Sequence, residues 1–405
     1  MVKRVIVIGG GTGGTLLVNL LGRKLRSRIK GGEAEVLLIS DGFRHYFQPG
    51  NLDIAFRGVP PDVNSRGEPE LLTPAVNFVP DPCAKINLAE RTVTTQGRTT
   101  YGYDMVVLAT GATPSPELIP GLKEGSFNFH ASPRSSESIW ERLRGFRRGK
   151  VIVAIAGLPY KYPPSPDEAL FMLDDYFKRK GIRKEVDLSF LTPYSRSYPS
   201  ESIARVVDPI MEEHEVEVVP LFNVESVDPA KKQIHSRGGD EVSYDLMIGV
   251  PPHVGASVVR ASGISDENGW IPVDKQTLRV KGHDDAYAIG DATDIPISKS
   301  GVAAHLEAKA VAETLVWELG GERAEARYNG RTDCPIELGG RRAIFVSTSY
   351  DTPVELRSPS LLRYAMKRGF ARLYWSTITG NMEWLIDAYF GRTTEKTEQP
   401  LVIQD

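Results

Sequence analysis

The fold is decided by residues 5–14, VIVIGGGTGG, which continue directly into the apolar run 15–21, TLLVNLL. The four aliphatic residues predict a short buried strand, and the apolar run predicts a helix. In such a strand–loop–helix unit, Gly9 permits a tight turn and Gly11 lets the backbone approach a pyrophosphate. Gly14 allows the helix to pack closely on the strand. The helix N-terminus then offers free N–H groups and a partial positive charge to phosphates, which predicts a dinucleotide-binding loop.

A second signature lies far downstream, where residues 286–293 read AYAIGDAT and a strand ends in Gly290-Asp291. One glycine loop is a weak signal, whereas two such signatures indicate that the chain wraps both halves of a long dinucleotide. We therefore predict a flavoprotein that binds FAD.

The adenosine ribose of such a cofactor is held at the end of the second strand. Residues 34–39, AEVLLI, predict this strand, and Ser40 and Asp41 follow it. Either residue is a candidate ribose ligand. Asp41 equally fits a residue that only caps the next turn.

The composition sets broad limits on the class of protein. The chain has 405 residues, a net charge of −3 and two cysteines, Cys83 and Cys334. This length allows two or three domains, and the near-balanced charge argues against a nucleic-acid partner. Two cysteines cannot form a disulfide framework, and we expect no metal site. No signal peptide is visible, so we expect a cytoplasmic protein. No run of about eighteen apolar residues exists, so we expect no membrane-spanning helix. A homo-oligomer is compatible with these features.

The order of predicted elements indicates an α/β fold of two tandem Rossmann-like domains plus a C-terminal α+β region. The internal echo between residues 103–111 and 244–250, both Tyr-Asp followed by an apolar run and glycine, supports two related units. The expected boundaries are 1–112 with 285–320 for the FAD-binding domain, 113–284 for the second domain, and 321–405 for the C-terminal region. Further strands are expected at 150–157, 186–191, 215–219 and 342–349, and helices at 167–180, 203–214, 302–319, 361–375 and 382–390.

The second domain lacks a glycine loop at the position where an NADH-using flavoenzyme carries one. The matching segment, residues 156–168, reads AGLPYKYPPSPDE and contains one glycine and four prolines. Proline has no N–H to donate and fixes φ, so this loop cannot form the usual phosphate cradle. We therefore expect no ordinary NAD(P)H site.

These motifs resemble the sulfide:quinone oxidoreductase and flavocytochrome c sulfide dehydrogenase family, and the resemblance covers nearly the whole chain. It rests on the two glycine signatures, the proline-rich loop and four short motifs: residues 47–51, 109–111, 299–301 and 334–335. The resemblance implies FAD, a sulfur donor at one flavin face and a quinone acceptor at the other. The residues it assigns to the cofactor are Gly9, Gly11, Thr12, Gly14, Pro49, Asn51, Ala109, Thr110, Gly111, Gly290, Asp291 and Lys299, in addition to Ser40 and Asp41.

The family uses two redox cysteines beside the flavin, and the resemblance assigns one of them to Cys334. The other position, six residues before Glu168, is Tyr162, which cannot form a disulfide or a persulfide. A thiolate is the reactive form in this chemistry. Cys83 is expected to be an ordinary, partly buried cysteine.

The resemblance also pairs Glu168 with Lys299 near the flavin ring. This pair would relay the proton that a reduced flavin gains, or it would be a structural ion pair between the domains. Residues 361–375, LLRYAMKRGFARLYW, predict a basic amphipathic helix that lies on an anionic membrane surface or packs on the core.

Three functions follow from these features. The first is a peripheral membrane enzyme, on the inner face of the membrane, that moves two electrons from sulfide or a related donor through FAD to a quinone. The second is a relative that has lost sulfide oxidation and uses another donor, which Tyr162 favours. The third is an FAD-binding electron-transfer subunit of a protein complex.

Overall fold

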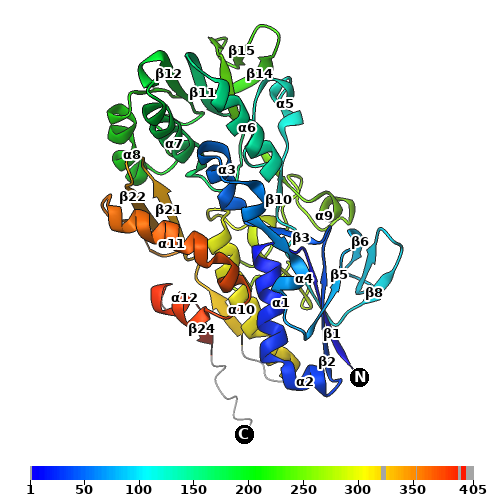
Figure 1. Ribbon diagram of the computed structural model, residues 1–405. Helices are drawn as coiled ribbons and strands as arrows, with labels where there is room; N and C mark the ends of the chain where they lie inside the picture. Colours follow the sequence, from blue (N-terminus) through cyan, green and yellow to red (C-terminus); the bar gives the residue numbers. More distant parts are fainter. Residues whose placement is uncertain (1, 321–324, 353, 391–393, 398–405) are drawn as a thin grey trace.

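The structure is a computed structural model and describes residues 2–320, 325–352, 354–390 and 394–397. The remaining residues of the predicted C-terminal region therefore lie outside the described part. Figure 1 shows two α/β units, one above the other, with the C-terminal helices lying along one side of both. The predicted α/β class is confirmed.

The lower unit is built on a parallel sheet around the glycine-loop strand. Strand β1 (Lys3–Ile8) lies between β2 (Ala34–Ile39) and β9 (Met105–Leu108). The outer strands are β5 (Val76–Val79) and β19 (Ala286–Ala288), which gives the order β19-β9-β1-β2-β5. Because β19 comes from beyond the second unit in sequence, the chain leaves this sheet and returns to complete it.

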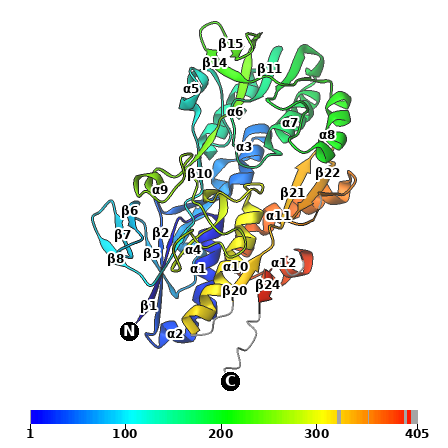
Figure 2. The same ribbon diagram turned by 180° about the vertical axis from the view of Figure 1, so that it is seen from behind.

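Two helices cover one face of this sheet. Helix α1 (Thr12–Lys24) and helix α10 (Gly301–Gly320) lie side by side in both views (Figures 1 and 2). Apolar residues of both helices join the sheet in one buried core, with Leu16, Leu17 and Val311 fully buried. The predicted helix at 302–319 is therefore confirmed, and it brings the carboxyl end of β19 next to the glycine loop.

The upper unit repeats the plan with four parallel strands in the order β13-β12-β11-β17. These are β11 (Gly149–Ile155), β12 (Val186–Leu191), β13 (Val216–Val219) and β17 (Leu246–Val250), with helices α7 (Ser165–Lys180) and α8 (Glu201–Glu213) packed beside them. The strands and helices predicted for this unit are confirmed within a few residues. On this topology we propose the limits 113–284 for the second domain and 1–112 with 285–320 for the first.

The C-terminal region adds an antiparallel sheet and two helices. Strand β21 (Thr332–Glu337) pairs with β22 (Ala343–Thr348), and helices α11 (Leu361–Ile378) and α12 (Glu383–Phe390) follow. Both predicted helices are confirmed, and α11 contacts the sheet as well as α1. Most of its side chains are only partly buried, and Leu361 and Leu362 at its start are exposed. Among the described residues, no helix combines the length and apolar character that a membrane crossing requires.

Candidate functional site

The glycine loop has the geometry that a pyrophosphate requires. Gly9 has φ +111°, and a Cβ at this position would lie 2.3 Å from the carbonyl oxygen of Ala109. A Cβ at Gly14 would lie 1.9 Å from the carbonyl oxygen of Gly9, so the turn closes only with glycine at both positions. A Cβ at Gly11 would meet no atom within 4 Å, so the outer side of this residue is open to a ligand. Helix α1 begins there without a side-chain cap or an acidic residue in its first turn, so its N–H groups are free for phosphate.

A cavity of about 130 Å³ lies above this loop and is lined by both glycine signatures. Nine of the predicted cofactor residues line it: Gly11, Thr12, Pro49, Asn51, Ala109, Gly111, Gly290, Asp291 and Lys299. The buried atoms Asn51 Oδ1 and Thr110 Oγ1 have no hydrogen-bond partner within the described part of the chain. Because buried polar atoms are normally paired, these two atoms fit a polar ligand such as a flavin ring or its ribityl chain.

Ser40 and Asp41 lie outside this cavity, at the carboxyl end of β2. Ser40 is buried, and its hydroxyl would lie 2.7 Å from a Cβ placed on Gly10, whereas Asp41 is exposed. Their position next to the glycine loop agrees with a ribose contact. That role, and the choice between the two residues, stays a prediction.

Lys299 also lines the cofactor cavity, but the predicted pair between Lys299 and Glu168 is wrong. The Lys299 ammonium donates to the carbonyl oxygens of Thr293, at 2.6 Å, and Asp291, at 3.2 Å, and lies 4.2 Å from the centre of the Trp270 ring. The backbone carbonyl of Lys299 accepts from the N–H of Tyr162, so the backbone meets the proline-rich loop while the side chain points to the Gly-Asp turn.

Lys367 of α11 takes the predicted place of Lys299 and forms an ion pair with Glu168. Glu168 is fully buried in the first turn of α7 and also accepts from the N–H of Glu337, at 2.6 Å. Burial raises the pKa of Glu168 above its usual range, and the Lys367 ammonium opposes that effect. Sequence spacing could not identify this partner because Lys367 lies 199 residues away, in a stretch whose pattern predicts only a basic amphipathic helix.

Glu168 and Lys367 belong to a second cavity, of about 200 Å³, beside the first. Its walls include three predicted catalytic residues, Tyr162, Glu168 and Cys334. Six residues line both cavities: Thr12, Pro49, Leu52, Tyr162, Ser300 and Gly301. A group bound here would therefore lie against the cofactor cavity, and we name this second space the substrate cavity.

Cys334 lies in β21, with 5% of its surface exposed. Its sulfur is 3.6 Å from the hydroxyl of Ser298, and burial raises the pKa of the Cys334 thiol despite the nearby hydroxyls of Ser298, Thr332 and Ser300. The thiol is therefore protonated in this surrounding and needs a base or a bound ligand before it reacts.

Tyr162 reaches from the proline-rich loop to the same strand as Cys334. Its hydroxyl oxygen lies 2.9 Å from the Pro335 carbonyl oxygen and 3.1 Å from Glu168 Oε2, so these two acceptors share its one proton. Burial raises the pKa of Tyr162 well above its usual value, and the neighbouring Glu168 carboxylate adds to the rise. Tyr162 is therefore a neutral hydrogen-bond donor that connects Glu168 to the backbone next to Cys334.

An ion-pair network surrounds this part of the cavity. In addition to Glu168 and Lys367, Arg57 pairs with Asp53 and with Glu337, and Arg368 pairs with Asp53. Three carboxylates thus face three cations, and the network joins helices α3 (Asn51–Arg57), α7 and α11 to strand β21. The balance of charge offsets part of the cost of burying these groups away from bulk water.

The cofactor cavity holds further polar side chains that the motifs did not reveal. The Lys161 ammonium is buried and donates to Gln48 Oε1, at 2.6 Å, and burial lowers its pKa. His130 lies nearby, with its Nε2 3.0 Å from the Ser165 hydroxyl. Lone basic residues in loops carry no sequence signal, and only the fold brings these three segments together.

The proline-rich loop leads into a helix whose first turn contains Asp167 and Glu168. Both carboxyl groups are buried, and burial raises the pKa of Asp167 well above its usual value. Acidic side chains at a helix N-terminus oppose phosphate binding. The expectation that no ordinary NAD(P)H site exists here stays a prediction with this added support.

Cys83, in β6 (Cys83–Asn87), lines neither cavity and is partly buried. Burial raises the pKa of its thiol to about 11. It therefore has neither the position nor the acidity of a partner for Cys334.

Comparisons with known proteins agree with this geometry. Residues 3–154 match the family described as pyridine nucleotide-disulphide oxidoreductase. The mitochondrial sulfide:quinone oxidoreductase of Mus musculus is 25% identical over 92% of this chain and 85% of its own. The sulfide-quinone reductase of Aquifex aeolicus is 25% identical over 94% of this chain and 93% of its own.

The crystal structure of the Aquifex aeolicus sulfide:quinone oxidoreductase superposes with a TM-score of 0.85 at 20% identity, over 98% of both chains. This match confirms the fold, including the C-terminal region. The family match, the sequence relatives and the cofactor cavity show that the chain is an FAD-dependent oxidoreductase, and its sequence is similar to sulfide:quinone oxidoreductases over most of its length.

Proposed function

We propose that the protein moves two electrons from sulfide, through FAD, to a quinone. The observation that carries this proposal is the position of Cys334 in a cavity that shares a wall with the cofactor cavity. The substrate cavity is also largely apolar, with Phe345, Phe370 and Ala371 among its lining residues, which suits the ring of a quinone.

FAD supplies the two-electron acceptor for sulfide and the two-electron donor for quinone. Cys334 takes the sulfur: its S–H bond breaks, and a new S–S bond to the sulfide sulfur gives a persulfide, Cys–S–SH. The thiol and hydrosulfide together release one proton and two electrons, so the sulfur pair is oxidised as the flavin is reduced. With Tyr162 in place of a second cysteine, the terminal sulfur stays on Cys334 until another sulfide or thiol removes it.

Glu168, Lys367 and Tyr162 are suited to proton transfer in this reaction. The Glu168 carboxyl has a raised pKa and lies between the Tyr162 hydroxyl and the Lys367 ammonium. Raising the pKa of a carboxyl brings it closer to the working pH, which makes it a better general acid or base. We propose that the Glu168 carboxyl accepts the proton that the sulfur releases and donates a proton to the quinone.

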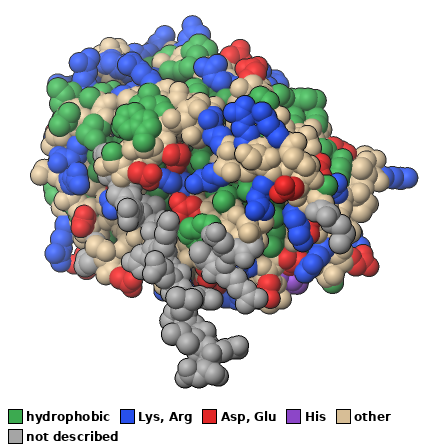
Figure 3. All heavy atoms as spheres, turned by 90° about the horizontal axis from the view of Figure 1, so that it is seen from below, with side chains coloured by type: hydrophobic (Ala, Val, Ile, Leu, Met, Phe, Trp, Pro, Cys, Tyr) green, Lys and Arg blue, Asp and Glu red, His purple; other side chains and the backbone are tan. Residues whose placement is uncertain are grey.

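We also propose peripheral contact with the inner face of a membrane, through the exposed apolar residues Leu361, Leu362 and Trp384, which are 62%, 70% and 69% exposed. They lie at the start of α11 and in α12, close in sequence to the basic residues of α11. Seen from below, the molecule presents groups of apolar side chains among Lys and Arg side chains (Figure 3). Such a mixture suits an anionic lipid surface, where a quinone is available.

The proposed function is tested with Cys334→Ser and Cys83→Ser, two variants with the same chemical change. Under anaerobic conditions, we expect sulfide to reduce the flavin of the wild type and of Cys83→Ser. Cys334→Ser should bind FAD and remain oxidised. Sulfide reduction in Cys334→Ser at the wild-type rate would refute the role of Cys334, and reduction of the wild type by NADH would refute the interpretation of the proline-rich loop.

A further inference from the structure

A buried polar chain runs from the substrate cavity into the FAD-binding unit and takes no part in the reaction as described so far. It begins at Tyr374 of α11, whose side chain lines the substrate cavity. The Tyr374 hydroxyl lies 2.6 Å from His45 Nε2 and 2.8 Å from the hydroxyl of Thr12. His45 Nδ1 lies 3.1 Å from Glu68 Oε2, and Glu68 Oε1 accepts from the Thr15 hydroxyl, at 2.6 Å. We name these residues the Tyr374–His45–Glu68 chain.

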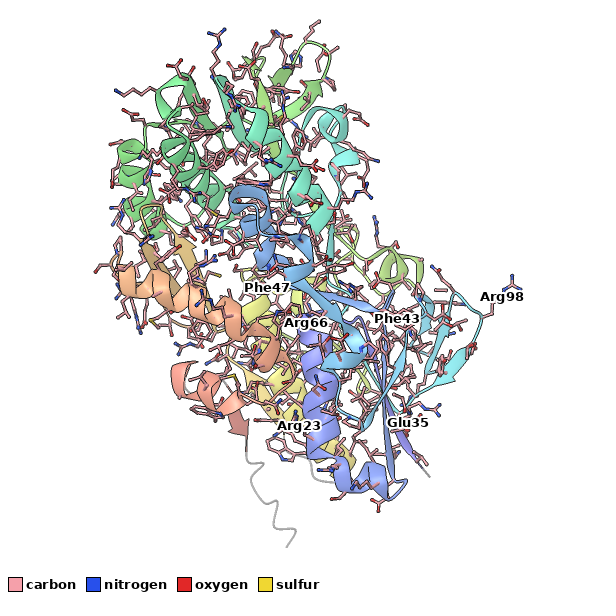
Figure 4. The ribbon with its side chains drawn as sticks, in the orientation of Figure 1. Arg23, Glu35, Phe43, Phe47, Arg66 and Arg98 are labelled. Atoms are coloured by element: carbon pink, nitrogen blue, oxygen red, sulfur yellow. The ribbon has the colours of Figure 1, made fainter. Side chains whose placement is uncertain are left out.

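The chain is assembled from separate elements that the fold brings together. His45 lies in β3 (Arg44–Tyr46), Glu68 directly follows β4 (Ser65–Gly67), and these two strands pair in an antiparallel ribbon. Thr15 belongs to α1. Phe47, which Figure 4 labels near Arg66 in the middle of the molecule, packs against Tyr374 with ring centres 4.4 Å apart and ring planes tilted by 40°.

Burial makes the ionisable part of this chain costly. The side chains of His45 and Glu68 are 0% and 1% exposed. Burying an acid–base pair away from water is costly, and a connected chain of such groups that ends in a cavity has the arrangement that proton transfer requires. Arg66 pairs with His45 across the ribbon, and its guanidinium lies 5.1 Å from the ring centre of Trp375.

We propose that Tyr374 is the proton donor to one carbonyl oxygen of the quinone, and that His45 and Glu68 return the proton to Tyr374. This inference rests on the proposed quinone reduction. A quinone takes two electrons and two protons, and its two carbonyl oxygens lie on opposite sides of the ring. The substrate cavity contains two proton-donating groups from different elements, Glu168 with Lys367 and Tyr374 with His45.

The proton transfer balances within the chain. The Tyr374 O–H bond breaks as an O–H bond forms on the quinone, while two electrons arrive from the reduced flavin. The imidazole Nε2–H of His45 then protonates the phenolate oxygen, and His45 Nδ1 takes the proton shared with Glu68. The His45–Glu68 pair ends one proton short and is refilled from water after the hydroquinone leaves. Burial raises the pKa of Tyr374, so the neutral phenol is the stable form of this side chain before the transfer and after His45 has returned the proton.

The test separates proton delivery from electron transfer with two acceptors. Tyr374→Phe, prereduced with sulfide, is mixed with a soluble short-chain ubiquinone or with ferricyanide, which takes electrons without protons. We expect flavin reoxidation by the quinone to slow by about 10²-fold, the usual contribution of a general acid. The rates of sulfide reduction and of ferricyanide reoxidation should be unchanged. Tyr350→Phe is the matched control, since it also loses a hydrogen-bonded phenol hydroxyl, which here donates to the Lys275 carbonyl at 2.6 Å, away from both cavities.

A second variant distinguishes proton transfer from a phenol that only holds α11 in place. Glu68→Gln keeps the size of the side chain and removes its proton, and it should slow the quinone step and reduce its solvent deuterium isotope effect. Three results would overturn the proposal. The first is equal slowing with ferricyanide, and the second is a raised quinone KM with an unchanged maximal rate. The third is a wild-type isotope effect in both variants. A wild type that no quinone reoxidises would instead refute the proposed function.

Discussion

Replacement of Lys367 by methionine removes the one cation in contact with the fully buried Glu168 among the described residues. The network that surrounds it then has three carboxylates, Asp53, Glu168 and Glu337, against two cations, Arg57 and Arg368. Glu168 keeps the N–H of Glu337 and the hydroxyl of Tyr162 as donors. We expect the pKa of Glu168, already raised by burial, to rise further in this variant.

The loss of folding stability in Lys367→Met depends on pH, because the Glu168 carboxyl can take up a proton instead of remaining charged. Breaking a buried ion pair costs about 3–5 kcal/mol. Protonating the carboxyl instead costs about 1.4 kcal/mol for each pH unit above about 4.3, the pKa of glutamate in an unfolded chain. This sets an upper limit of about 1 kcal/mol at pH 5 and about 4 kcal/mol at pH 7. A folded state with a raised carboxyl pKa binds more protons than the unfolded state, so its stability falls as the pH rises. The variant should therefore lose stability relative to the wild type from about pH 5 upward.

The assay is thermal unfolding, followed by flavin fluorescence, of wild type, Lys367→Met and Lys367→Arg across this range of pH. We expect the unfolding midpoints of wild type and Lys367→Met to lie close together at acid pH and to separate steadily toward neutral pH. Lys367→Arg keeps the charge and should follow the wild type, and adding Glu168→Gln to Lys367→Met should remove the pH dependence. Parallel pH profiles for Lys367→Met and wild type would refute the assignment of Lys367 as the partner of Glu168.

The remaining predictions concern the cofactor loop, the membrane surface and Lys299. Gly14→Ala should unfold or greatly destabilise the apoprotein, because its Cβ would lie 1.9 Å from a backbone oxygen, whereas Gly11→Ala should leave apoprotein unfolding unchanged and weaken FAD binding in a fluorescence titration. Leu362→Asp should reduce sedimentation with anionic lipid vesicles without changing sulfide-driven flavin reduction; unchanged sedimentation with a loss of dimers in light scattering would assign this surface to oligomerisation. Lys299→Met should lower the unfolding midpoint by the same amount from about pH 5 to about pH 7, since Lys299 contacts carbonyl oxygens rather than Glu168; a loss that grows with pH over this range would contradict that position.

Much of the fold could be predicted because its determinants are local. The buried strand at residues 5–8 and the glycines at fixed positions after it form a motif that can be recognised in the sequence alone. The structure places both as predicted. The same holds for three residues of the site, because the motifs place them at the ends of particular strands and helices. These residues, Cys334, Tyr162 and Glu168, line one cavity.

The rest of the site depends on where the C-terminal helix packs. Lys367 and Tyr374 lie in a stretch whose pattern predicts only an amphipathic helix, and nothing in it shows which side chains enter the cavity. The Lys299 error has the same origin, since the motif places the backbone beside the proline-rich loop but does not determine the direction of the side chain. His45 and Glu68 are isolated polar residues in short strands and turns, and only their burial reveals them.

The central claim is that a sulfur donor reduces the flavin through a cavity that contains a single cysteine among the residues that the structure describes. The direct measurement is an anaerobic titration of the FAD-loaded protein with sulfide, followed by addition of a soluble ubiquinone, with the visible flavin band recorded throughout. We predict that sulfide bleaches the band, that one persulfide forms per protein on Cys334 by mass spectrometry, and that the quinone restores the band. A band that sulfide leaves unchanged would contradict the account.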